Sequence, residues 1–168
     1  DVAALWAVGT SLGDSAYAIT AKQASHAYSR GTDMSFVGTT TLESQGFPLE
    51  DVVMLTAGLR TDTSATNGTS VDNGAATSNG IVGHLQFIDI TGSNCTVTIQ
   101  ESSDDGSSDA FAAIVAFTQV TADNKFERKT ATGAVERYLR VITAGTFSSA
   151  KFAVAARRGT AEDSDAIS

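Results

Sequence analysis

Short alternating apolar segments, separated by clusters of Gly, Asp, Ser and Asn, dominate the chain from Asn79 to Arg158, where helical periodicity is almost absent. Several strands at such spacing, broken by turn residues, are typical of an antiparallel β-sandwich or barrel. We therefore predict an all-β, antiparallel β-sandwich. Because such a fold presents surfaces and strand edges, a binding or assembly role is the first functional expectation.

The pattern divides the chain into four parts. Residues 1–60 carry apolar runs at 4–8, 16–28, 34–42 and 52–59, which predict the strands of a first β portion. Residues 61–80 are short of large apolar side chains and contain three Asn-Gly pairs, which indicates a linker or long loop. Residues 81–158 are expected to form a second β-sandwich, Ig-like or jelly-roll-like, and residues 159–168 a flexible acidic tail.

Within 81–158, two local features refine the strand prediction. Ile81, Leu85 and Phe87 share one parity, whereas Ile88 and Ile90 share the other, which indicates a bulge or a change of buried face near Ile88. The apolar run 111–120 is long enough for a short helix, but its flanking turns favour a strand. Further strands are expected around 97–100, 135–142 and 152–156.

Charge and cysteine content exclude several classes of protein. The net charge of -8 argues against sequence-independent nucleic-acid binding, which depends on Lys and Arg neutralising phosphates. No apolar run approaches the ~18 residues of a membrane span, so we expect no membrane span. Cys95 is the single cysteine, so an internal disulfide framework is excluded. The first residue is Asp1, and no leader pattern follows it, so we expect a processed or truncated chain.

Candidate catalytic residues are few. The stretch from Gly9 to Gly13 fits G-x-S-x-G, but that chemistry needs a strand-to-helix elbow, and no helix-forming stretch follows. A Gly-rich turn is the expected structure. His26 and His84 are expected at a surface or interface, and Cys95 lacks a paired His and carboxylate pattern. We assign no catalytic residue and no cofactor.

One acidic loop is a candidate cation site. Glu101, Asp104, Asp105 and Asp109 crowd around Gly106, and hard oxygen ligands at this density suit Ca²⁺. The spacing differs from that of the twelve-residue helix-flanked loop. A solvated hairpin tip, in which Asp side chains bond nearby backbone, explains the composition equally well. We assign no metal ligand.

The aromatic residues suggest a second functional class. Trp6, Tyr17, Tyr28 and Tyr138 offer rings with polar tips that could stack on sugar rings. The same residues serve core and interface packing equally well. A carbohydrate-binding sandwich on a virion or cell surface is therefore the alternative to an assembly role.

Four segments carry a resemblance to a known family: residues 71–80, 96–104, 137–141 and 152–155. In these segments the chain resembles the C-terminal region of the major tail (tail tube) proteins of tailed bacteriophages. The resemblance implies a virion location and a β-sandwich subunit that stacks as rings into a hollow tube. Its partners would be further copies of itself and other tail proteins. In such proteins a substantial β-rich portion precedes the matched region, so either that portion has been cleaved or the assembly differs.

Strand edges allow assembly on physical grounds alone. Exposed edges pair with other chains unless Pro, charge or bulges block them, and the chain contains one Pro. A head-to-tail contact that closes gives a ring, and one that does not close gives a filament. A capsid decoration protein or a filament-forming surface protein would have the same sequence pattern.

Overall fold

The computed structural model describes residues 2–31, 35–44 and 46–160, and within these ranges every regular element is a β-strand. The strands pair antiparallel throughout, in the order β1-β2-β4-β10-β7-β8, with β3 on β2, β5 and β6 on β10, and β9 on β7. This confirms the all-β, antiparallel prediction. The strands are β1 (Val2–Ala7), β2 (Ser15–Arg30), β3 (Phe36–Ser44), β4 (Glu50–Met54), β5 (Arg60–Asp62), β6 (Val71–Asp72), β7 (Ile81–Ser102), β8 (Ala112–Ala116), β9 (Lys125–Ala131) and β10 (Tyr138–Arg158).

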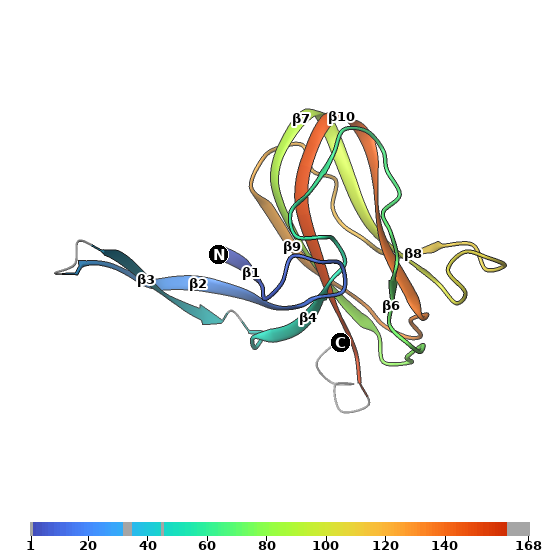
Figure 1. Cartoon of the computed structure of the whole chain (residues 1–168), viewed down its shortest axis with the longest axis horizontal. Helices are drawn as coiled ribbons and strands as arrows, with labels where there is room; N and C mark the ends of the chain where they lie inside the picture. The colour runs from blue at the N-terminus through green and yellow to red at the C-terminus, as the bar shows by residue number, and fades with distance from the viewer. Residues whose placement is uncertain (1, 32–34, 45, 161–168) are drawn as a thin grey trace.

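The fold is organised around the ladder between β7 and β10, which bends back on itself into two layers (Figure 1). The register slips near Phe147, where Gly92 and Gly145 have φ of 144° and 130°. A Cβ on Gly92 would lie 2.4 Å from the Cα of Phe147, and one on Gly145 would lie 2.5 Å from the carbonyl oxygen of Asn94. Glycine is therefore needed on both strands at the bend. The result is a β-sandwich in which one pair of strands supplies both sheets.

The main core lies between the two layers of this bent ladder. Phe87 and Phe152 stack with their ring centroids 5.9 Å apart, and Val97, Ile99 and Val141 are fully buried. Burying each such side chain stabilises the fold by roughly 1.5–3 kcal/mol. Val97 and Ile99 alternate with Thr96, Thr98 and Gln100, which is how the strand period places one face inside.

The predicted change of face at Ile88 is confirmed as a bulge. Phe87 is opposite Phe152 and Asp89 is opposite Lys151, so Ile88 has no partner in the ladder. The bulge lets Leu85 and Phe87 point into the core while the strand continues with the opposite parity.

A second, smaller core joins the N-terminal strands to the sandwich. Ala16 and Ala18 of β2 pack with Ala153 and Ala155 of β10, and Val52 and Met54 of β4 complete the cluster. β4 lies between β2 and β10 in the sheet and pairs with both of them. Beyond this contact, β2 and β3 continue away from the sandwich as a projecting hairpin (Figure 1).

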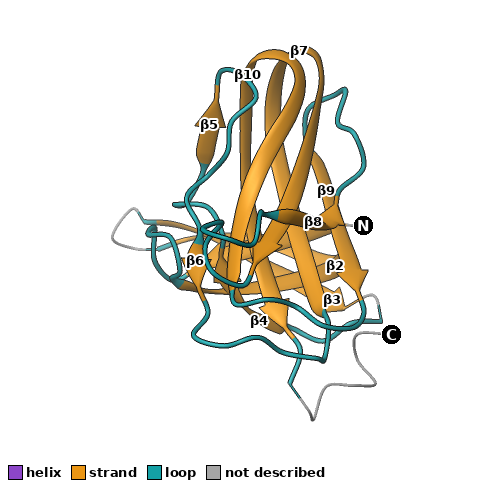
Figure 2. Cartoon of the chain, turned by 90° about the vertical axis from the view of Figure 1, so that its right-hand side faces the viewer, coloured by secondary structure: helices purple, strands orange, loops and turns teal. Residues whose placement is uncertain are grey.

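Several strand boundaries differ from the expectations. The segments expected separately at 81–90 and 97–100 form the single strand β7, and those at 135–142 and 152–156 merge into β10. The 61–80 segment runs alongside β10 (Figure 2). Strands β5 and β6 pair with β10, and isolated bridges join Asn67 to Ile142 and Thr77 to Val135. Strand β9 was not expected at all. Because β4 pairs with β10, the two expected β portions share one sheet, and most of the expected 159–168 tail lies outside the described residues.

Candidate functional site

The projecting hairpin is the most unusual surface of the molecule; we call it the arm, residues 22–30 of β2 with β3. Every residue of 22–30 is exposed, as are all residues of β3 except Leu42, which is half-buried. Both faces of the arm therefore meet solvent. An isolated two-stranded hairpin is marginally stable at best in water, so an arm of this kind is expected to gain stability from a partner.

An aromatic cluster lies near the end of the arm. Tyr28 and Phe36 stack with ring centroids 5.1 Å apart, and His26 meets Tyr28 edge-on at 4.3 Å. His26 Nδ1 lies 2.6 Å from the hydroxyl of Thr40 across the ladder. Although they contact one another, Phe36 is 69% and Tyr28 64% exposed. We call Tyr28 and Phe36 the tip pair.

An apolar groove lies at the base of the arm. Trp6 and Tyr17 are opposite each other in the β1–β2 ladder, and Trp6 is 77% exposed. The groove has a volume of about 540 Å³, and its lining is Trp6, Val8, Tyr17, Ile19, Leu42 and Leu49. We call it the base groove. Its walls are almost wholly hydrocarbon, which suits an apolar side chain better than a sugar, whose hydroxyls need several hydrogen-bond partners.

A buried ionic cluster connects the first residue of β4 to the sandwich. Glu50 Oε1 accepts a hydrogen bond from Arg128 Nη2 at 2.9 Å, Oε2 accepts one from Arg128 Nε at 3.0 Å, and His84 Nε2 lies 2.8 Å from Oε2. The Arg128 guanidinium also covers the ring of Phe47, 3.8 Å from its centroid. Burial raises the pKa of Glu50, but the hydrogen bonds from His84 and Arg128 outweigh it and lower that pKa from 4.5 to about 2. The sequence predicts His84 at a surface or interface, but its imidazole is buried against Glu50.

The acidic loop after β7 is held together by its own backbone. Asp104 accepts hydrogen bonds from the N–H groups of Ser107, Ser108 and Asp109, and Asp109 accepts two from Ser103. These bonds lower the pKa values of both carboxyls. Within the part of the chain that the structure describes, no group of three His, Cys, Asp or Glu side chains converges in a way that suits a metal ion. The loop is therefore a hairpin tip whose carboxylates Asp104 and Asp109 accept hydrogen bonds from residues of the same loop.

The G-x-S-x-G stretch forms the loop between β1 and β2. Asp14 accepts a hydrogen bond from the backbone N–H of Ser11 at 2.7 Å, and the chain then continues as a strand instead of a helix. This is the expected turn. Cys95 is fully buried on β7, and burial raises the pKa of its thiol to about 11, which opposes thiolate formation.

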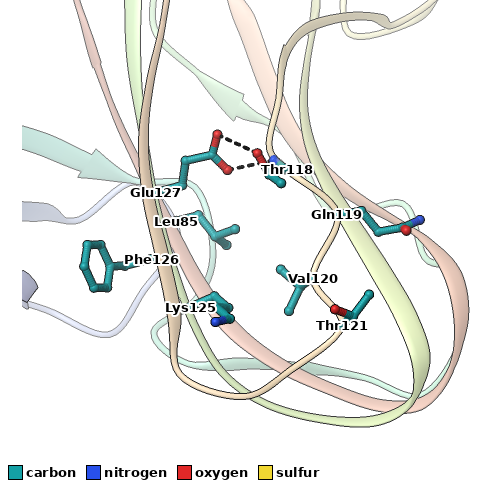
Figure 3. A pocket seen from close by; sticks show the side chains of 8 residues that line it. All are labelled: Leu85, Thr118, Gln119, Val120, Thr121, Lys125, Phe126 and Glu127. Atoms are coloured by element: carbon teal, nitrogen blue, oxygen red, sulfur yellow. Dashed lines mark hydrogen bonds between the residues drawn. The ribbon is translucent and has the colours of Figure 1, made fainter.

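A shallow hollow of about 400 Å³ lies between β9 and the segment that follows β8 (Figure 3). Its most polar contact is already made, because Glu127 accepts hydrogen bonds from both the N–H and the hydroxyl of Thr118. Lys125 and Gln119 also line the hollow, but the reactive side chains around it do not point toward a common centre. The hollow does not indicate a particular ligand.

The four aromatic residues considered for sugar stacking are separated in the structure. Trp6 and Tyr17 meet in the base groove, Tyr28 lies on the arm, and Tyr138 is on the sandwich with Arg137 4.9 Å from its ring centroid. Sequence reasoning did not connect Trp6 and Tyr17 with the other side chains that line the groove, which are Val8, Ile19, Leu42 and Leu49. No local signal could have found them, because the lining comes from β1, β2, β3 and the loop before β4.

Comparisons with protein-family models, with curated proteins and with solved structures found no match to this chain. Among the described residues, none belongs to a helix with the length and apolar character needed to cross a membrane.

Proposed function

We propose that this protein is a structural subunit that assembles by repeated packing of identical copies, as the major tail tube subunit of a tailed bacteriophage. In this proposal its partners are further copies of itself and other tail proteins of the virion, and it performs no catalytic turnover. A capsid decoration protein or a filament subunit would also act by assembling, but the assembled structure would not be a tail tube.

The observation that carries the proposal is the arm. A hairpin that leaves the hydrophobic core and exposes both faces does not stabilise the subunit that bears it. It is explained if another molecule covers it. Among the described strands β3 pairs with β2 alone, so its outer edge offers backbone groups for pairing, and the single Pro of the chain is outside that strand.

Chemical features elsewhere support a non-catalytic role. Within the 101–109 loop, Asp104 accepts hydrogen bonds from backbone N–H groups and Asp109 accepts two from Ser103, and Cys95 is buried. Arg128 and His84 are engaged by Glu50. These side chains are therefore committed to holding the fold.

The test is electron microscopy of the purified native protein over a range of concentrations. Tubes or stacked rings with a central channel are the expected result. Solid filaments would retain the assembly role and reject the tube, and a dispersed monomer at every concentration would reject the proposal.

Carbohydrate binding is a second candidate because Trp6 and Tyr17 form an exposed aromatic pair. A glycan array is the direct test. Binding that Trp6→Ala abolishes and Tyr138→Ala preserves would favour this alternative. The absence of signal on the array would remove it.

A further inference from the structure

The tip pair and the base groove lie on the same face of the arm sheet. Phe36, Gly38, Thr40 and Leu42 have the same parity in the uninterrupted strand β3, so they share one face. Tyr28 is opposite Gly38, and Leu42 is opposite Gln23. The aromatic tip and the hydrocarbon base therefore belong to one continuous surface.

A register shift in β2 maintains this surface. The pairing passes from Gln23 opposite Leu42 to Ser25 opposite Thr41, so Ala24 has no partner. Without this bulge, the odd-numbered residues that include Tyr17 would continue on the groove face, and Tyr28 would point to the other side. The bulge places Tyr28 on the same face as Tyr17.

The shared face differs from the rest of the molecule in charge. On this face β2 and β3 carry no Asp or Glu, and their one formally charged side chain is Arg30. At the base, Asp51 of β4 is opposite Tyr17 and lies on the same face. The chain as a whole carries a net charge of -8. Two copies repel each other over most of their surfaces, and the β2–β3 part of this face is where they can approach without bringing carboxylates together.

The exposed aromatic area supplies the centre of a contact. Trp6, Tyr17, Tyr28 and Phe36 are 77%, 42%, 64% and 69% exposed. With about 150–250 Å² for each aromatic side chain, they present roughly 500 Å² per copy. Two copies that engage each other bury this area on each partner, against about 800 Å² per partner in a standard interface, and a head-to-tail contact buries about half of it on each partner. Val8 and Leu49 add aliphatic surface beside them. Aromatic side chains in such a centre are typical of residues that dominate binding.

From these observations we infer that the tip pair of one copy occupies the base groove of a second copy. The inference rests on the proposed assembly function and specifies its contact. Each copy carries both halves of the contact, so no other protein is needed. If each tip engages a different neighbour, the contact repeats head to tail and builds a ring or filament; if two copies engage each other, a dimer results.

The experiment uses single cysteines at the two halves of the contact. Phe36→Cys and Leu49→Cys proteins are mixed and oxidised mildly, and disulfide-linked dimers are measured on a non-reducing gel. The native Cys95 is buried and does not interfere. The matched control is Val37→Cys mixed with Leu49→Cys, because Val37 is adjacent on β3, 50% exposed, and on the opposite face.

We expect a strong cross-link from the Phe36 mixture and its loss in the Val37 mixture, because a disulfide needs Cα atoms within about 7 Å. Phe36→Asp is expected to raise the midpoint concentration of association about tenfold or more, whereas Val37→Asp leaves it close to wild type. All these positions are exposed, so the folded subunit tolerates the changes, which circular dichroism verifies.

The outcomes separate the inference from the proposed function. If the wild-type protein assembles but the two cysteine mixtures cross-link equally, the contact lies elsewhere and only the inference is wrong. If a Phe36→Cys/Leu49→Cys double variant gives a ladder of cross-linked oligomers on the gel, the copies contact one another head to tail. Cross-linked dimers without a ladder support the contact but reject continuous assembly through it. A wild-type monomer at every concentration overturns both.

Discussion

Replacing Glu50 by Gln tests how the N-terminal strands are held to the sandwich. Gln keeps the shape of the side chain and its carbonyl oxygen but removes the negative charge that Arg128 and His84 share. Glu50 is only 2% exposed, so solvent does not screen the interaction. A pKa that falls from 4.5 in the unfolded chain to about 2 in the folded one corresponds to about 3 kcal/mol of stability at neutral pH.

The pH dependence follows from the direction of this shift. A carboxyl with a lowered pKa contributes its full stabilisation above pH 4.5, where it is ionised in both states, and loses it as the pH falls towards 2. Glu50→Gln is therefore expected to be about 3 kcal/mol less stable than wild type at pH 7. The difference should shrink steadily below pH 4.5.

The measurement is urea unfolding followed by circular dichroism at several pH values from 7 to 3. Asp51→Asn is the matched control, because Asp51 is adjacent, exposed and outside the ionic cluster. It removes the same charge from the chain without touching Arg128. The reasoning is refuted if Glu50→Gln unfolds at the wild-type urea concentration at pH 7, or if the difference between the two proteins does not depend on pH.

Three further outcomes are expected. Gly83→Val should lower the free energy of unfolding by about 1–3 kcal/mol in urea titration, because a Cβ there would lie 2.9 Å from Ile99 Cδ1 in the core; wild-type stability would contradict this packing. Cys95 should resist iodoacetamide in the native protein and react after unfolding, as mass spectrometry would show, and full native labelling would contradict its burial. Asp72→Asn should leave the urea midpoint nearly unchanged although Arg137 lowers the pKa of Asp72 to about 2, because the pair is solvent-exposed; a large shift of the midpoint would show that exposure does not weaken this pair.

The strands of the sandwich were largely predictable because their alternation reflects burial against the same chain. Leu85, Phe87 and the parity change at Ile88 are local signals, and the structure has the corresponding bulge. What local pattern could not show is that one ladder bends at Gly92 to form both layers. That bend depends on a backbone approach to Phe147, which is more than fifty positions away in the chain.

The sequence did not predict strand β9, for a different physical reason. Its sequence has four charged side chains in seven residues, and Phe126 is its single large apolar residue. Charge of this kind is expected on an edge strand, where it opposes unwanted pairing, but it removes the hydrophobic signal on which strand prediction depends. The pairing is instead stabilised by partners distant in sequence, including Glu50 for Arg128.

The arm shows why an assembly surface is harder to predict than a core. Tyr17 and Ile19 alternate with the buried Ala16 and Ala18, which is the pattern of a strand half-buried in its own protein. A strand whose apolar face is covered by another copy has the same pattern, because alternation indicates only that one face is kept from water. Only the structure, in which Trp6 and Phe36 remain exposed, separates the two cases. The same reasoning makes the arm the first place to perturb: a change there should alter association while leaving the free energy of unfolding of the sandwich almost unaffected, the reverse of what Glu50→Gln should do.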